Sequence, residues 1–160
     1  MFSFATRTEQ NDVQRLIRRI MDASAFSQIH TESESRVESR SNGTMSIVLT
    51  PCEQGSALLD KSVFAITKDW SSRGVSVITQ DRLNCDSVVL GFLIESRPYL
   101  LLGKVRTTIP IGGGFWQLGI ELMELLRLES SPGLSELLPL LWQLDANQSR
   151  AESSAWASRK

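Results

Sequence analysis

The sequence predicts a mainly β protein, in which six antiparallel strands close into a barrel and a helix stands at each end of the chain. Three observations predict it. Short segments rich in Val, Ile and Thr follow one another through the middle of the chain. Turn residues separate them so closely that the crossover helices of a parallel sheet have no room. Amphipathic segments precede and follow them. Closing the sheet would remove its exposed edges.

The first 30 residues predict a helical extension. Val13, Leu16, Ile17 and Ile20 recur at helical spacing, with arginines on the other faces. We expect this apolar stripe to pack on the barrel or on a partner, and a basic helix lying on a membrane is the less favoured alternative. Residues 31–43 are polar, with many Ser and Glu, and predict a flexible loop.

The barrel is expected over residues 44–128, and residues 129–160 predict a C-terminal helix and a polar tail. That helix should begin near Pro132 and cover one end of the barrel. Gly112, Gly113 and Gly114 are followed by a strand rather than a helix, so they predict a hairpin turn and not a phosphate cradle. The expected strands are Thr44–Thr50, ended by Pro51, and Ser62–Thr67, Gly74–Thr79, Ser87–Ile94, Tyr99–Thr108 and Phe115–Glu124.

Charge and cysteine content limit the partners. A net charge of −1 over 160 residues argues against duplex nucleic acid. Cys52 and Cys85 match no CxxC pattern, and His30 is the single histidine, so we expect reduced thiols and no metal. The N-terminus lacks a signal-peptide pattern, and no run approaches ~18 apolar residues. We therefore expect a cytoplasmic protein without a membrane span.

Two short motifs flank the first strands. Arg36 and Arg40 form an RxxxR pattern in the polar loop, and Asp69 to Gly74 form a DxSxxG pattern between the second and third strands. In this order and context the chain resembles the PilZ family, whose members bind cyclic di-GMP. The resemblance covers roughly Ser35 to Leu128. It includes Leu118-Gly119-Ile120-Glu121-Leu122, which is similar to the last barrel strand of that family.

The resemblance implies a PilZ-like barrel with cyclic di-GMP across its outer face, clamped by the N-terminal loop. Arg36 and Arg40 suit the O6 and N7 acceptors of guanine or a phosphate, and which arginine does which stays open. Asp69 can accept hydrogen bonds from guanine donors. Ser71 lies two residues further on, on the same face, and can donate to the ligand. Gly74 allows close backbone approach and a positive φ.

The residues between these positions have less specific roles. Arg73 could add a phosphate contact, although a solvated turn residue is the preferred interpretation. Trp70 falls on the face opposite Asp69 and should pack in the core. Some PilZ-type proteins carry a further Arg where this chain has Ser35, so stoichiometry stays open and one ligand per site is mildly favoured.

The expected function is a cyclic di-GMP sensor with no catalysis of its own. Ligand binding would order residues 31–43, move the N-terminal helix and signal to a downstream protein that the sequence does not identify. The alternative is a ligand-free PilZ-like barrel that acts as a protein adaptor. A barrel for single-stranded nucleic acid fits the charge poorly. The sequence contains no GxSxG motif or acid–base pair, which argues against an enzyme. Apolar helices at both ends leave a homodimer open.

Overall fold

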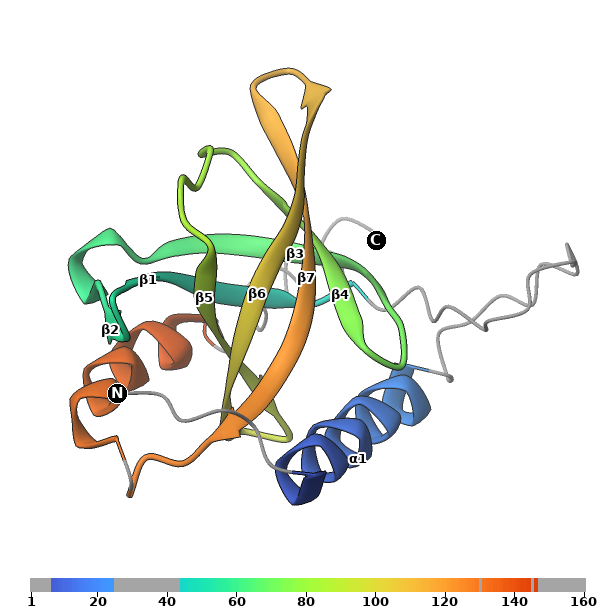
Figure 1. The fold of residues 1–160 in the computed structure, drawn as a ribbon, viewed down its shortest axis with the longest axis vertical. Coiled ribbons are helices and arrows are strands. Elements are labelled where there is room, and N and C mark those ends of the chain that lie inside the picture. Colours follow the sequence, from blue (N-terminus) through green and yellow to red (C-terminus); the bar gives the residue numbers. More distant parts are fainter. Residues whose placement is uncertain (1–6, 25–43, 130, 145, 147–160) are drawn as a thin grey trace, which may run out of the picture.

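A computed structural model describes residues 7–24, 44–129, 131–144 and 146. Helix α1 (Arg7–Ser24) precedes seven strands, and a short turn of helix, η3 (Pro132–Leu137), follows them (Figure 1). A second short helical turn, η2 (Leu59–Lys61), interrupts the strands. The strands are β1 (Ser46–Glu53), β2 (Ser56–Ala57), β3 (Val63–Trp70), β4 (Gly74–Thr79), β5 (Ser87–Ile94), β6 (Arg97–Gly112) and β7 (Phe115–Leu126).

Six of the strands form a closed ring. Their order is β1-β3-β4-β7-β6-β5, and pairing of β5 back to β1 completes the circle. Every pairing is antiparallel, as the sequence predicted. The two-residue β2 pairs only with the end of β1, and it is too short to have produced a sequence signal. The expectation of an antiparallel, mainly β fold with a helix on either side is confirmed.

The expectation that Pro51 ends the first strand is wrong. β1 continues through Pro51, which pairs with Val88 of β5. The carbonyl of Pro51 accepts a hydrogen bond from the amide of Leu58, so it faces away from β5. Pairing with β3 has already stopped at Leu49. The missing N–H of Pro51 therefore removes no ladder bond, which is the position where a strand tolerates proline.

The turns between the later strands follow the sequence closely. Glu95 and Ser96 have φ values of 51° and 63°, which matches a two-residue hairpin turn of the primed type. Gly112, Gly113 and Gly114 all have positive φ and join β6 to β7. The predicted glycine hairpin turn is thereby confirmed. The strands beside it are longer than predicted, because β6 and β7 form a hairpin that projects from the ring (Figure 1).

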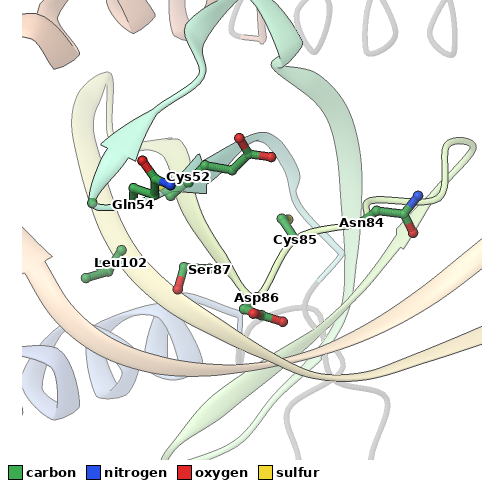
Figure 2. A pocket seen from close by; sticks show the side chains of 9 residues that line it. Cys52, Gln54, Asn84, Cys85, Asp86, Ser87 and Leu102 are labelled. Carbon is green, nitrogen blue, oxygen red and sulfur yellow. The ribbon is translucent and has the colours of Figure 1, made fainter.

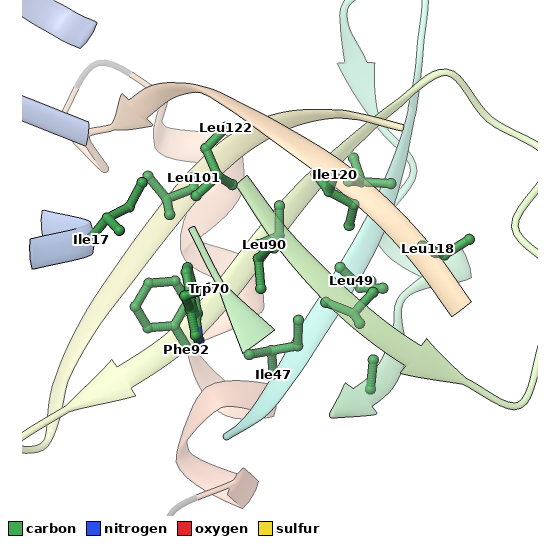
Figure 3. Close-up of a cluster of buried hydrophobic side chains, with 14 of the residues drawn as sticks. Ile17, Ile47, Leu49, Trp70, Leu90, Phe92, Leu101, Leu118, Ile120 and Leu122 are labelled. Atoms are coloured by element: carbon green, nitrogen blue, oxygen red, sulfur yellow. The ribbon is translucent and has the colours of Figure 1, made fainter. Parts of the chain in front are cut away.

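The main core fills the interior of the ring and reaches α1. Residues such as Leu49, Trp70, Leu90 and Phe92 are fully buried there (Figure 3). The predicted apolar stripe of the N-terminal helix joins this cluster, with Ile17 only 1% exposed. Helix α1 therefore packs on the ring through β7.

A second core lies on the outer wall of the ring. Along β1 and β5, neighbouring residues alternate between the two clusters, so both faces of these strands are buried. The C-terminal helical segment supplies the cover, since Pro132 begins η3 as predicted and helical residues 138–144 follow. This segment covers the wall rather than one end of the ring, which corrects the expectation. Its buried residues are Leu134, Leu137, Leu141 and Leu144.

The sequence left open a homodimer through the apolar faces of the two helices. Both faces instead pack against the ring of the same chain. The exception is Trp142 of the C-terminal segment, which is 47% exposed. Among the described residues, no helix is both long enough and apolar enough to span a bilayer.

Candidate ligand-binding site

A β-bulge in β3 places Asp69 on the outer face of the ring. Ala65 and Thr67 are buried, so strict alternation would turn Asp69 inward as well. Instead, the register with β4 shifts between Thr67 and Asp69. One extra residue in a strand reverses the side of the sheet to which each later residue of that strand points. Asp69 therefore lies half-buried on the outside, and Trp70 turns into the core.

The buried position of Trp70 confirms its predicted role. It is 0% exposed, and its ring and that of Phe92 form a T-shaped pair with a centroid distance of 5.8 Å. An edge-to-face contact of this kind adds to the burial energy of two large rings. The core thus anchors the end of β3 one residue away from the candidate site.

The turn after β3 is held by Ser71. Its amide donates to the carbonyl of Gly74 at 2.9 Å. Its hydroxyl accepts from the amides of Gly74 at 3.2 Å and Arg73 at 3.5 Å, and donates to the Gly74 carbonyl at 3.4 Å. A hydroxyl has one proton and two lone pairs, so the turn engages all of them. Ser71 is therefore first a residue that shapes the turn.

Gly74 is needed for close approach and not for a positive φ. Its φ does not lie in the left-handed region, so that part of the expectation is wrong. A Cβ at this position would overlap the backbone carbonyl oxygen of Ile120 on β7. Gly119, directly across the sheet from Ser76, is similarly restricted, because a Cβ there would overlap Oγ1 of Thr107. The two glycines keep β4, β7 and β6 closely packed beside the turn.

The residues of the DxSxxG motif come together in one open pocket of about 370 Å³. Asp69, Ser71, Arg73 and Gly74 all line it. The register continues the site across the sheet, in a row from Asp69 to Ser76, Gly119 and Thr107. The remaining lining residues are Val75, Arg106, Ile120 and Glu121.

Sequence reasoning missed Arg106. Its Nε and Nη2 atoms each lie 2.7 Å from Oε2 of Glu121, so the carboxylate holds the guanidinium beside the pocket. Simple alternation of faces along β6 does not place Arg106, because the register with β7 shifts between Val105 and Thr107. The sequence did hold a signal for this arginine, namely Glu121 in the last predicted strand. An outward carboxylate on one strand favours a cation on the neighbouring strand.

A smaller pocket of about 300 Å³ adjoins the site. Arg73 and Glu121 line both pockets, and Val13 and Gln14 of α1 complete the second one. The β3–β4 turn therefore touches the candidate site on one side and borders the N-terminal helix on the other. Arg36 and Arg40, the other predicted ligand contacts, lie outside the described residues.

A larger pocket, about 710 Å³, lies elsewhere (Figure 2). Cys52 and Cys85 both line it, although 32 residues separate them in the sequence. Burial raises the pKa of the Cys52 thiol to about 11, and burial followed by the nearby Asp86 carboxylate raises that of Cys85. Such thiols are poor nucleophiles. Within the described ranges, no cluster of His, Cys, Asp and Glu side chains could hold a metal ion.

Comparison with known proteins gives structural likeness only. No protein-family model and no curated protein matches the sequence. Among solved structures, the Bacillus subtilis inhibitor of motility (MotI/DgrA) is similar, with a TM-score of 0.44 and 16% identity over 74% of this chain and 53% of that one. MrkH of K. pneumonia in its apo state has a TM-score of 0.40 and 16% identity over 76% and 56%. This chain therefore spans little more than half the length of either protein.

Proposed function

We propose that this chain binds cyclic di-GMP in the pocket beside the β3–β4 turn of a PilZ-like barrel, and that it is a sensor rather than an enzyme. The observation that carries the proposal is that Asp69, Ser71, Arg73 and Gly74 line a single pocket. Their common outward placement depends on the bulge in β3 and on the Ser71 turn, so it does not follow from their closeness in sequence alone.

Asp69 supplies the base specificity in this proposal. An ionised carboxylate only accepts hydrogen bonds, and the Watson–Crick edge of guanine presents two adjacent donors, N1–H and the 2-amino group. Adenine presents an acceptor at N1, which would face the carboxylate unfavourably. Gly119 lines the same pocket without a side chain of its own, and Oγ1 of Thr107 occupies the space that a Cβ there would take.

Charge balance explains why the described pocket needs the loop arginines. Arg73 and Arg106 offset Asp69 and Glu121 among the lining residues, so the pocket has no net charge. Cyclic di-GMP carries two phosphate charges, which a neutral pocket binds weakly. Arg36 and Arg40 would add two positive charges in a geometry suited to phosphate or to the guanine edge. The proposal therefore requires both loop arginines.

The position of Arg73 suggests how binding reaches the rest of the chain. Arg73 lines the candidate site and also the pocket beside α1. A phosphate contact at Arg73 would pull the turn relative to the helix. Together with ordering of residues 31–43 by Arg36 and Arg40, this would move α1 and report the ligand to a partner protein.

Isothermal titration calorimetry with cyclic di-GMP, cyclic di-AMP and GTP tests the proposal. We expect selective binding of cyclic di-GMP that Asp69→Ala and Arg40→Ala abolish. Asp81→Ala and Arg97→Ala are matched controls, because both side chains are exposed and neither lines the pocket. Equal binding of cyclic di-AMP, or full binding by Asp69→Ala, would refute the proposed base recognition.

One observation favours the second candidate function, a ligand-free adaptor. The Ser71 hydroxyl is fully used within its turn. Ser and Gly would therefore be kept in this motif for the fold alone. No binding of any of the three nucleotides to the wild-type chain would favour the adaptor.

A further inference from the structure

The outer face of the β3-β4-β7-β6 sheet divides into a polar half and an apolar half. The polar half is the row from Asp69 to Ser76, Gly119 and Thr107 that lines the candidate site. The next row of outward residues, about 7 Å further along the strands, is different in character. It runs from β3 to β6 through Ile66, Ile78, Gln117 and Ile109.

The same face stays apolar beyond that row. Phe64 lies two residues before Ile66 on β3, and Phe115 lies two residues before Gln117 on β7, so alternation puts both on the outer face. Five large side chains of this face are between 39% and 51% exposed. We call the whole surface the apolar half-face; its residues are Phe64, Ile66, Ile78, Ile109, Ile111 and Phe115.

This amount of apolar exposure is unusual on one face of a small protein. Single exposed Leu or Ile residues are common, but several large exposed apolar residues on one face of four strands indicate an interaction surface. Part of it stands on the projecting β6–β7 hairpin (Figure 1). From Thr107 to Gln117 that hairpin carries no charged residue. The side chains that flank its tip therefore add apolar surface, and no charged group would have to lose its water when a partner binds there.

The charge on this surface has one sign. Lys68 is the single charged residue at the outward positions of these rows, and its Nζ lies 3.4 Å from Oε1 of Gln117. Asp69 and Glu121 line the candidate site instead. Asp81 and Arg82 follow β4 as neighbours of opposite charge. The apolar half-face is thus complementary to an apolar ligand with an acidic flank.

The size of the surface indicates the kind of segment that would fit. Four strands span three gaps of about 4.8 Å, or roughly 14 Å. A helix rises about 1.5 Å per residue, so nine or ten residues cross the four strands. Such a helix presents positions i, i+3 or i+4, and i+7 to the sheet.

We propose that the apolar half-face docks an amphipathic helix of a partner protein, with apolar residues at those positions and an acidic residue near Lys68. The inference rests on the proposed role as a module that acts through a partner. It does not rest on nucleotide binding. Because the polar and apolar halves share all four strands, ligand and helix would lie side by side on one sheet. A ligand-induced shift of the β3–β4 strands would then change the helix-binding surface directly.

Selection from a displayed library of random peptides of about twelve residues tests the proposal. The full chain is the target, and the Ile66→Ser/Ile109→Ser variant is the counter-selection target. We expect enriched sequences to place apolar residues at i, i+3 or i+4, and i+7, with at least one Asp or Glu. The best synthetic peptide should bind the double variant about tenfold or more weakly than the wild type.

Matched variants control for fold and position. Phe64→Ser/Phe115→Ser should weaken the peptide similarly through a separate pair of side chains. Trp142→Ser should leave peptide binding unchanged, since Trp142 is comparably exposed but belongs to the C-terminal helix. Peptides without this pattern, or equal binding to wild type and both double variants, would overturn the proposal.

Two further measurements exclude other occupants of the surface. Sedimentation velocity would overturn the proposal if it showed a wild-type dimer that Ile66→Ser/Ile109→Ser dissociates. Pelleting with phosphatidylcholine–phosphatidylglycerol vesicles would do so if the same variant abolished it. Calorimetry on that variant separates this inference from the proposed function, because cyclic di-GMP binding should persist while peptide binding falls. A wild-type chain that binds the peptide but no nucleotide would refute the ligand and support the docking surface.

Discussion

Alanine at the two glycines beside the candidate site should respond differently to the removal of one neighbouring side chain. An alanine Cβ at Gly119 would overlap Oγ1 of Thr107, which is a side-chain atom. An alanine Cβ at Gly74 would overlap the carbonyl oxygen of Ile120, which is backbone. Thr107→Ala removes the first obstacle, whereas no side-chain truncation removes the second. A double-mutant cycle therefore distinguishes them.

The magnitudes follow from the contacts. Inserting a methyl group into an occupied site costs about 1–3 kcal/mol, so Gly119→Ala should destabilise the wild type by that amount. With Thr107→Ala present, the nearest remaining side-chain contact of the new Cβ is Thr107 Cβ at 3.7 Å, an ordinary distance. Alanine in a strand is then better than glycine by about 0.5–1 kcal/mol. The same substitution should thus change sign between the two backgrounds.

Urea unfolding followed by tryptophan fluorescence measures the cycle, with Trp70 as a buried reporter. Gly74→Ala should cost about 2–3 kcal/mol in both backgrounds, because the carbonyl of Ile120 stays. A Gly119→Ala variant that is neutral in the wild type would refute the reasoning. So would a Thr107→Ala background that gives no rescue.

Three further predictions concern the turn, the helix and the buried thiol. Ser71→Ala removes every hydroxyl contact of the turn and should cost about 1–2 kcal/mol of unfolding free energy, whereas the exposed neighbour Ser72→Ala should cost almost nothing. Ile17→Ala should cost about 2–4 kcal/mol, because α1 is part of the main core, and the exposed Arg18→Ala serves as its control in the same assay. The pKa of Cys52 is raised from 9.0 to about 11, so the folded state keeps the thiol neutral after the unfolded chain has ionised. Stability from Cys52 is therefore full below pH 9 and is lost as the pH rises towards 11. The stability advantage of the wild type over Cys52→Ala should shrink across that range, and an unchanged difference would contradict the shift.

Most of the strands could be read from the sequence because their composition and spacing are local properties. β4 and β5 have the predicted bounds, and the glycine turn between β6 and β7 lies where expected. The errors occur where the neighbours of a strand decide its length. β1 passes through Pro51 because β3 has already left that side, and β6 is long because β7 continues beside it. Such pairings join residues far apart in the chain.

The same limit applies to the surface of the ring. Phe115 is a large apolar residue at the start of the last expected strand, yet it is 39% exposed on the projecting hairpin. Hydrophobicity predicts burial only when another element is available to cover the residue. The C-terminal leucines cover β1 and β5, but in the described part of the chain no element covers the apolar half-face. Composition alone cannot indicate which wall of a closed sheet receives the cover.

Asp69 and Trp70 show why local alternation succeeded at the site although the register was unknown. The argument that these neighbours face opposite ways holds for any extended pair. Which of the two faces inward depends on the bulge, because without it the buried Thr67 would place Asp69 in the core. A buried unpaired carboxylate and an exposed Trp would both be costly, so the sequence itself favours the bulged register. Because Trp70 must be buried in the core, Asp69 must face outward. The proposed recognition of the ligand at this face therefore depends on the packing of the neighbouring residue.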